Sequence, residues 1–181
     1  MQFGKELFQK KSVGQPTFSP QVAGDYFAKL YHDEKRDHSF DPLPEMKRPP
    51  LPQFPLFENP PTKQEIAEVL RLKRNCAAPG PNGISYVPYK RCPALIPTLQ
   101  GIFSKVWKSK DVPPNWASAS VLLLSKSEQT SNPAEFRPIA LTNTIGKIFF
   151  SIFSKRLESF MLVNKFTSHS QKGFKAYPGL P

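Results

Sequence analysis

The most restrictive feature of the sequence is a cluster of eight prolines between residues 42 and 61. Proline has no backbone N–H, fixes φ, and disfavours helical backbone at the residue before it. Extended, polyproline-like backbone is therefore expected in this segment. The apolar residues between the prolines are expected to hold it against the domain that follows; they are Leu51, Phe54, Leu56 and Phe57. The proline spacing also fits a ligand for an SH3-type domain, and this alternative stays open.

The rest of the chain allows one sizeable domain, because 181 residues are too few for two full domains beside such a segment. We divide the chain into a leader, residues 1–61, with a short helix and a proline-rich linker, and a domain, residues 62–181. Residues 1–60 contain eight basic and eight acidic residues, whereas residues 61–181 contain seventeen basic and six acidic residues, the whole net charge of +11. A basic domain is typical of proteins that bind nucleic-acid phosphates, although a merely soluble basic surface is the alternative.

The sequence contains no signal for export or membrane insertion. It has no run of eighteen apolar residues, and its first eleven residues lack an apolar stretch of signal-peptide length. A soluble intracellular protein is expected, neither secreted nor membrane-spanning, in a compartment that the sequence does not specify. Neither a disulfide scaffold nor a zinc site is expected, because the cysteines and histidines are isolated; they are Cys76, Cys92, His32, His38 and His169.

Capping residues and apolar spacing predict the first three helices. Ser19, followed by a proline in the first turn, is expected to cap a short amphipathic helix in the leader. Thr62 and Glu65 form a capping box, and apolar residues follow it at helical spacing. This helix must stop by Ala78, because the turn Pro-Gly-Pro-Asn-Gly comes next. A third helix is expected over residues 95–108.

One β-hairpin is expected in the second half of the chain. Two short apolar runs, Ala119–Leu124 and Phe136–Leu141, predict buried strands joined by a long polar loop. Buried strands need a cover. A helix capped by Asn143 or Thr144 and ending near Asn164 is expected to provide it, because its apolar residues recur every three to four positions.

Three segments, in this order, carry a resemblance to a known family. They are Ala78–Ile84, Phe136–Asn143 and Gln171–Phe174, with the motifs Ala-Pro-Gly-Pro-Asn-Gly-Ile, Phe-Arg-Pro-Ile-Ala-Leu-Thr-Asn and Gln-Lys-Gly-Phe. They resemble the fingers and upper palm of reverse transcriptases from non-LTR, LINE-like retrotransposons, and the likeness covers about residues 60–175. The resemblance implies an α+β fold, mostly helical with one β-hairpin, that forms partial fingers and palm of a right-hand polymerase after a proline-rich leader.

Arg137 and Lys126 are the candidate nucleotide-binding residues. A polymerase must present cations to the triphosphate of the incoming nucleotide. Lys126 follows the first predicted strand and Arg137 lies in the second, so both are expected to face one groove. The resemblance implies that Arg137 contacts the triphosphate and that Lys126 lies near the same phosphates or the template. Without the resemblance, a surface arginine before a proline would be the simpler interpretation.

The resemblance also implies contacts to nucleic acid. Gln171 and Gly173 correspond to a segment beside the template and primer strands, where glycine lets backbone approach closely. An unordered tail is the alternative. Lys147, on the helix after the second strand, is expected to contact nucleic acid as well. Asn82 stands in a turn where the family usually has aspartate, and the turn should still form because both residues tolerate it.

The sequence lacks the carboxylate cluster that two-metal nucleotide transfer requires. No Asp-Asp pair occurs, and the acidic residues beyond Thr62 are Glu65, Glu68, Asp111, Glu128, Glu135 and Glu158. In the family, the catalytic aspartates follow a segment like Gln171–Phe174. We therefore expect no catalytic residue, no metal-binding residue and no cofactor in this chain, with Mg²⁺ needed only by the complete family enzyme.

These features predict the amino-terminal fragment of an RNA-directed DNA polymerase, inactive by itself. The complete protein is expected to bind an RNA template, a DNA primer and dNTP, and no membrane. Without a palm, apolar residues should be exposed on the helix over residues 145–160 and on the strands. Two alternatives stay open: a basic nucleic-acid-binding module without enzymatic activity, and an interaction protein that uses the proline-rich leader.

Overall fold

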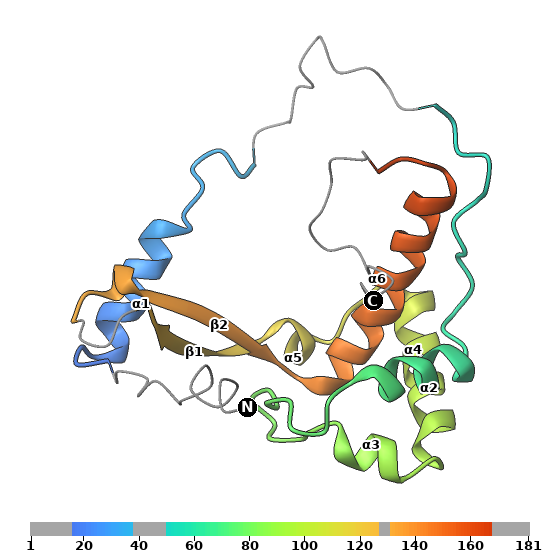
Figure 1. The fold of residues 1–181 in the computed structure, drawn as a ribbon, viewed down its shortest axis with the longest axis horizontal. Coiled ribbons are helices and arrows are strands. Elements are labelled where there is room, and N and C mark those ends of the chain that lie inside the picture. The colour runs from blue at the N-terminus through green and yellow to red at the C-terminus, as the bar shows by residue number, and fades with distance from the viewer. Residues whose placement is uncertain (1–15, 38–49, 127–130, 168–181) are drawn as a thin grey trace, which may run out of the picture. The chain divides into compact units, whose positions relative to one another are not determined.

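The computed structural model describes residues 16–37, 50–126 and 131–167 (Figure 1). The elements in these ranges are α1 Pro20–Leu30, α2 Lys63–Leu72, α3 Val87–Arg91, α4 Leu95–Ser109, α5 Pro114–Ala117, β1 Ala119–Ser125, the 3₁₀ turn η2 Pro133–Glu135, β2 Phe136–Thr142 and α6 Thr144–Val163. β1 and β2 pair in a two-stranded sheet, so the expected combination of helices with a hairpin is confirmed. None of these helices is long and apolar enough to cross a membrane.

The described residues gather into two compact units. The hairpin unit contains residues 16–37, 120–126 and 131–141, and the helical unit contains residues 50–119 and 142–167. Each unit combines segments that are far apart in the sequence. The domain boundary after residue 61, which we placed from composition, stays a prediction.

The hairpin unit consists of α1, β1, η2 and β2. Ser19 caps α1 as predicted, since its Oγ accepts a hydrogen bond from the backbone N–H of Val22 at 3.3 Å. The rings of Phe18 and Phe136 meet edge to face, with their centroids 5.1 Å apart. This aromatic contact attaches the start of α1 to the start of β2.

The expectation of two buried strands was wrong. No residue of β1 is buried, and Phe136 is the one buried residue of β2. Val121 has 60% of its surface exposed, and Ile139 is exposed as well. A two-stranded sheet presents two faces, and one short helix in this unit is too little to cover both. Exposed apolar residues occur on the strands and on α6, where Phe150 and Phe153 face solvent, as predicted for a chain without a palm.

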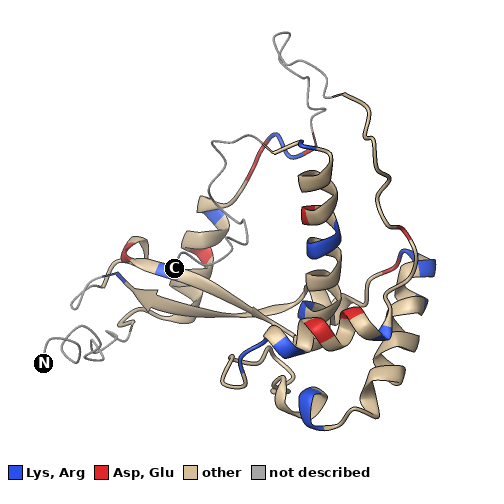
Figure 2. Cartoon of the chain, turned by 45° about the vertical axis from the view of Figure 1, so that its right-hand side comes forward, with Lys and Arg blue, Asp and Glu red and all other residues tan. Residues whose placement is uncertain are grey.

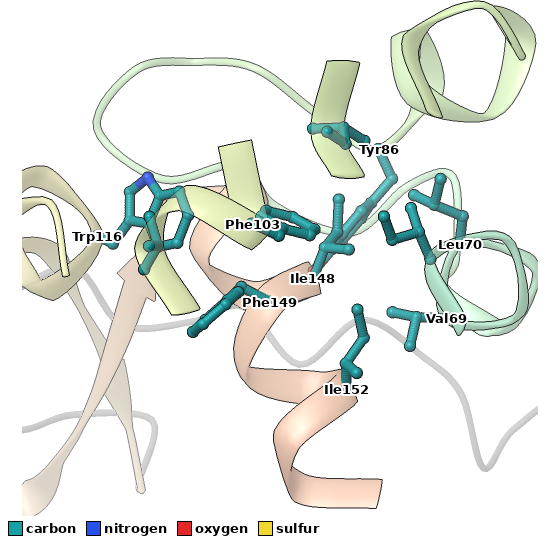
Figure 3. Packing of buried hydrophobic residues seen from close by; sticks show 11 residues of the cluster. Val69, Leu70, Tyr86, Phe103, Trp116, Ile148, Phe149 and Ile152 are labelled. Atoms are coloured by element: carbon teal, nitrogen blue, oxygen red, sulfur yellow. The ribbon is translucent and has the colours of Figure 1, made fainter. Parts of the chain in front are cut away.

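The core of the helical unit lies between α2, α4 and α6 (Figure 3). Phe103 of α4 is fully buried, and its ring meets those of Trp116 and Phe149 edge to face, at centroid distances of 5.8 and 5.4 Å. Burial of such a side chain contributes about 2–3 kcal/mol. The other buried members of the core recur at the predicted helical spacing on these three helices or lie next to them; they are Ile66, Val69, Leu70, Tyr86, Leu99, Val106, Ile148 and Ile152.

Local capping sets the helix ends. α2 begins with the predicted capping box: the N–H of Glu65 donates to Thr62 Oγ1 at 3.2 Å, and the N–H of Thr62 donates to Glu65 Oε2 at 2.9 Å. α6 begins after Asn143 and ends before Asn164, as predicted. The sequence did not predict α3 and α5, which are five and four residues long, because helices this short carry no periodic apolar pattern.

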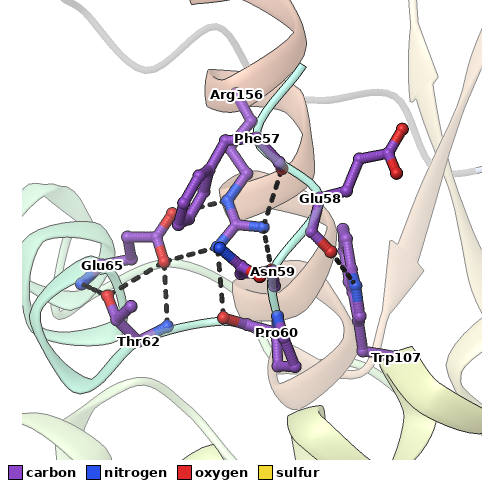
Figure 4. A network of polar contacts seen from close by, with 8 residues as sticks. All are labelled: Phe57, Glu58, Asn59, Pro60, Thr62, Glu65, Trp107 and Arg156. Atoms are coloured by element: carbon purple, nitrogen blue, oxygen red, sulfur yellow. Dashed lines mark hydrogen bonds and ion pairs between the residues drawn. The ribbon is translucent and has the colours of Figure 1, made fainter. Parts of the chain in front are cut away.

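Residues 50–61, here called the strap, are held to α4 and α6 through their carbonyl groups. Trp107 Nε1 donates a hydrogen bond to the carbonyl of Glu58 at 2.7 Å (Figure 4). The guanidinium of Arg156 donates to three further strap carbonyls at 3.3, 2.5 and 3.4 Å; these belong to Phe57, Asn59 and Pro60. Because proline-rich, extended backbone forms no internal hydrogen bonds, its carbonyl groups are available for such contacts.

The apolar side chains of the strap contribute less than predicted. Leu51 is 90% exposed, and Phe54 and Phe57 are each about half exposed, at 55% and 49%. The Phe57 ring does lie against the guanidinium of Arg156, 4.5 Å from its carbon. Asn164 pairs with both the N–H and the C=O of Phe54, each at 3.0 Å. The strap is attached to the helices that follow it, as expected, but by polar contacts more than by apolar burial.

Candidate nucleotide and nucleic-acid interface

Lys126 and Arg137 line one depression of about 280 Å³ in the hairpin unit. Lys126 comes directly after β1, and Arg137 is the second residue of β2, so strand pairing brings the two positions to the same end of the hairpin. The other lining residues come from α1, η2 and β2; they are Tyr26, Phe27, Leu30, Tyr31, Ala134, Phe136 and Pro138. The predicted juxtaposition of two cations beside one groove is present, and aromatic rings of α1 form part of its wall.

The ammonium of Lys126 is fixed by the turn opposite it. Its Nζ donates to the carbonyl of Ala134 at 2.6 Å, and its backbone N–H donates to the carbonyl of Glu135 at 2.8 Å. η2 holds Ala134 in place, because Oδ1 of Asn132 accepts a hydrogen bond from the N–H of Ala134 at 3.0 Å. An ammonium has three N–H donors, so this contact orients Lys126 and leaves donors for a ligand.

Arg137 lies between the buried ring of Phe136 and the fixed backbone of Pro138. Its own side chain is exposed. Arg137 therefore projects from a constrained stretch of backbone, which suits a guanidinium that must meet phosphate oxygens in a fixed geometry.

A larger depression of about 690 Å³ lies between α1 and β1 in the same unit. It is lined by apolar residues for the most part, among them Phe18, Ala23, Val121 and Leu123, and contains no lysine or arginine. The two basic residues therefore belong to the smaller depression at the loop end of the hairpin, and the larger depression has no cationic side chain in its lining.

In the helical unit, the predicted turn over residues 79–83 forms and rests on the start of α6. The N–H of Gly83 donates to the carbonyl of Gly80 at 3.0 Å, and Gly83 has a φ of +69°, which favours glycine. A side chain at Gly80 would overlap the carbonyl group of Thr142. The close approach of the turn to the end of β2 therefore requires glycine at residue 80.

Asn143 joins the turn to two other segments. Its Oδ1 accepts from the N–H of Asn82 at 3.1 Å, and its Nδ2 donates to the carbonyl of Asn115 at 2.7 Å. Thr144 donates to the carbonyl of Ile84 at 2.9 Å. The sequence predicted Asn143 as a helix cap only, and its side chain makes no capping bond. Its bridging role carries no sequence signal, because its partners are 61 and 28 residues away.

Asn82 takes part in the expected turn through its side chain. Its Oδ1 accepts a hydrogen bond from the N–H of Ile84 at 3.1 Å. This contact needs an oxygen acceptor two residues before a backbone donor, which asparagine and aspartate both supply. The expected turn is therefore present.

Lys147 lies near the start of α6 and is partly buried. Its Nζ is 3.4 Å from the carbonyl of Ala78, just before the turn, a long hydrogen bond that leaves the ammonium free to change partners. Gln171 and Gly173 lie outside the described residues, so the structure does not relate Lys147 to them. In the described ranges, no three His, Cys, Asp or Glu side chains gather where they could hold a metal ion, and Cys76 and Cys92 are free and exposed.

Comparisons with known proteins support a relationship to one class of enzyme. No protein-family model matches the chain. The chain is 29% identical over 114 residues to a probable RNA-directed DNA polymerase from transposon X-element of Drosophila melanogaster. It is 24% identical over 114 residues to a probable RNA-directed DNA polymerase from transposon BS of the same organism. Each alignment covers 62% of this chain and 13% of the relative. These matches support a distant relationship between this chain and retrotransposon RNA-directed DNA polymerases.

Proposed function

We propose that this chain is the amino-terminal fingers and upper-palm part of a reverse transcriptase from a non-LTR, LINE-like retrotransposon. The observation that carries the proposal is the similarity to two transposon RNA-directed DNA polymerases over 62% of the chain. The mixture of helices with one hairpin is compatible with such a region. The complete protein would copy an RNA template from a DNA primer.

In this proposal, Arg137 and Lys126 contact the triphosphate of the incoming dNTP. The position of both cations beside one depression supports the assignment. A triphosphate is highly charged, and preorganised cations stabilise it more effectively than mobile ones because little reorganisation is needed on binding. Lys126 is already oriented by the carbonyl of Ala134.

The proposed fragment does not polymerise by itself. Nucleotide transfer requires carboxylates that hold two metal ions, and beyond Thr62 the sequence has six acidic residues and no Asp-Asp pair. One of the six, Glu65, is engaged by Arg156. In the proposal, the metal-binding aspartates and their Mg²⁺ belong to a part of the polymerase outside this sequence.

Two measurements on the purified chain test the proposal. Binding of a fluorescent dNTP, followed by anisotropy, should weaken about tenfold in Arg137→Gln, the loss expected for one hydrogen bond to a charged group. Lys126→Gln should act in the same direction. Lys105→Gln, which removes an equal charge from an exposed position on α4, is the matched control and should bind like the unaltered chain. The nucleotide assignment would be refuted if all three substitutions weakened dNTP binding equally, or if none of them weakened it.

Inactivity has its own test. A primed RNA template, dNTP and Mg²⁺ are incubated with the chain, and primer extension is followed on a sequencing gel. No extension is expected because the metal-binding carboxylates are absent from the sequence. Template-directed extension that scales with the concentration of the chain would show that the proposal of an inactive fragment is wrong.

A basic nucleic-acid-binding module without an enzymatic role is the second candidate. The concentration of the whole net charge in residues 61–181 favours it. Such a module would bind RNA with a steep salt dependence and would show no dNTP binding that depends on Arg137. The anisotropy measurements therefore separate the two candidates.

A further inference from the structure

Three lysines of the helical unit gather around one serine. Lys147, Ser151 and Lys155 are spaced four residues apart on α6, so they lie on one side of that helix. Lys73, the residue that ends α2, reaches across and donates a hydrogen bond from Nζ to Ser151 Oγ at 2.9 Å. Ser151 Oγ in turn donates to the carbonyl of Lys147 at 2.6 Å. We call Lys73, Lys147 and Lys155 the lysine face.

Lys73 is fixed at both its backbone and its side chain. Lys90 of α3 donates a hydrogen bond from Nζ to the carbonyl of Lys73 at 2.8 Å, while Ser151 holds the ammonium. Four lysines from α2, α3 and α6 thus take part in one arrangement, within the helical unit whose basic positions are blue in Figure 2. This arrangement is preorganised, because the ammonium of Lys73 is held where two other cations approach it.

No carboxylate neutralises the lysine face in the described part of the chain. The ion pair between described residues is that of Arg156 with Glu65, and the next acidic position on α6 is Glu158, three residues beyond Lys155. Burial lowers the pKa of Lys73, and the charges of Lys155 and Lys147 lower it further. Like charges held this close repel one another, so an anionic ligand would relieve a repulsion built into the fold.

We propose that Lys73, Lys147 and Lys155 bind successive phosphates of a single-stranded RNA. Lys147 and Lys155 are eight residues apart on α6, about 12 Å along the helix axis, so the lysines extend from backbone positions spread along the helix. A chain of phosphates fits this spacing. The choice of RNA rests on the proposed function, because the relatives are RNA-directed DNA polymerases.

Sequence spacing showed only part of this face. The positions of residues 147, 151 and 155 are visible as a stripe on a predicted helix, but Lys73 is 78 residues from Ser151. Only the packing of α2 against α6 brings Lys73 to the stripe. The lysine face therefore adds two phosphate-binding residues, Lys73 and Lys155, to the Lys147 that the resemblance indicated.

The test compares two triple variants of the full chain. Fluorescence anisotropy with a labelled single-stranded uridine 20-mer measures affinity over a series of salt concentrations. Each lost phosphate contact should reduce the log-log salt slope by about 0.7, so Lys73→Gln with Lys147→Gln and Lys155→Gln should reduce it by about 2. That change corresponds to about 100-fold weaker binding at ~0.1 M salt. The control removes the same charge from exposed positions of α2 and α4: Lys63→Gln with Lys105→Gln and Lys108→Gln.

Ser151→Asp is a second variant, which keeps all three lysines. It places a carboxylate among them, and this internal counter-ion should compete with RNA and weaken binding at least tenfold. Thermal unfolding of each variant, followed by circular dichroism, establishes that the variants compared are folded. If the first triple fails to fold, Ser151→Asp decides the question.

Equal loss of binding in the two triples would overturn the proposal, because net charge alone would then explain affinity. A competition experiment with polyglutamate gives a second such outcome. If polyglutamate displaces the labelled RNA as strongly as unlabelled RNA does, the proposal is overturned in favour of an acidic protein partner. The proposed function fails separately. If the lysine face binds RNA while dNTP binding does not depend on Arg137, the chain is a nucleic-acid-binding module. If dNTP binding depends on Arg137 but RNA affinity does not depend on the lysine face, only this inference fails.

Discussion

The guanidinium of Arg156 donates hydrogen bonds to both carboxylate oxygens of Glu65, with Nε 2.6 Å from Oε1 and Nη2 2.7 Å from Oε2 (Figure 4). The side chain of Arg156 is 6% exposed and that of Glu65 is 25% exposed. The remaining donors of Arg156 bind carbonyl groups of the strap. One buried arginine thus joins α6, the start of α2 and the strap, and Glu65 takes part both in this pair and in the capping box of α2.

Arg156→Met should lower the free energy of unfolding by about 3 kcal/mol, because it leaves Glu65 and the strap carbonyls without their partner. Urea unfolding monitored by tryptophan fluorescence measures this change. Arg156→Lys is the matched control. It keeps the charge but lacks the planar fork, so it should recover less than half of the loss. Full recovery by lysine would show that charge, and not bidentate geometry, stabilises the unit.

Stability should fall at acid pH through Glu65. Burial raises the pKa of this carboxyl, but hydrogen bonds from Arg156 and Thr62 outweigh burial, so its pKa lies below the ordinary 4.5. The Glu65 carboxylate therefore binds a proton more tightly in the unfolded chain than in the folded chain. The stabilisation is complete above about pH 4.5 and is lost as the pH falls through the lower pKa of the folded state. Urea midpoints should thus decrease between about pH 6 and about pH 3 more steeply in the unaltered chain than in Glu65→Gln. Equal slopes would contradict this account.

Gly80→Ala should destabilise the helical unit by about 2–3 kcal/mol, because the new Cβ overlaps the backbone of Thr142. Gly83→Ala should cost about 1 kcal/mol, through its φ of +69° alone, since nothing lies near its Cβ position. Gly101→Ala, in open space on α4, should stabilise by about 0.5–1 kcal/mol. Thermal unfolding of the three variants gives the order. A Gly80→Ala chain as stable as the Gly101→Ala chain would place the turn away from the end of β2.

Asn164→Ala should release the outer part of the strap. Asn164 pairs with both backbone groups of Phe54, and these bonds are exposed, so the loss of global stability should be about 1 kcal/mol or less. The local effect should be larger: the amide of Phe54 should exchange faster with deuterium. Asn75→Ala, at an exposed position after α2, is the control and should leave that amide unchanged. Unchanged exchange in Asn164→Ala would mean that the strap is held without this pair.

Asn82→Asp should leave stability within about 0.5 kcal/mol, because a carboxylate oxygen can accept the hydrogen bond from the N–H of Ile84. Asn82→Ala removes that acceptor and should cost about 1 kcal/mol. Chemical denaturation of the two variants distinguishes the requirement for an oxygen from a requirement for the amide. Equal losses in both would show that the Nδ2 group, and not Oδ1, is needed.

Local chemistry in the sequence predicted much of the fold. The caps at Ser19 and Thr62 and the apolar spacing of α4 and α6 predicted helices that the structure contains, because a helix depends on residues three or four positions apart. The hairpin was predicted for a similar reason, from two apolar runs and a polar loop. Lys126 and Arg137 could be placed at one groove because strand pairing follows from that hairpin.

The burial of the strands was not predictable in the same way. Apolar strands normally lie in a core, and no residue pattern measures how much of a two-stranded sheet one short helix can cover. The attachment of the strap was predicted, but its mechanism was not, because Arg156 is 97 residues from Asn59 and its carbonyl partners leave no mark in a residue pattern.

The sequence by itself determined the starts of α1, α2, α4 and α6, the hairpin, the extended strap, the basic charge of residues 61–181 and the resemblance to reverse transcriptases, since each depends on neighbouring residues or on composition. Tertiary structure alone decided that Arg156 unites three segments, that Asn143 bridges the turn to α5, and that Lys73 joins Lys147 and Lys155. These contacts link residues 28 to 99 positions apart. Their formation depends on how α2, α4 and α6 pack around Phe103, and no local pattern encodes that packing.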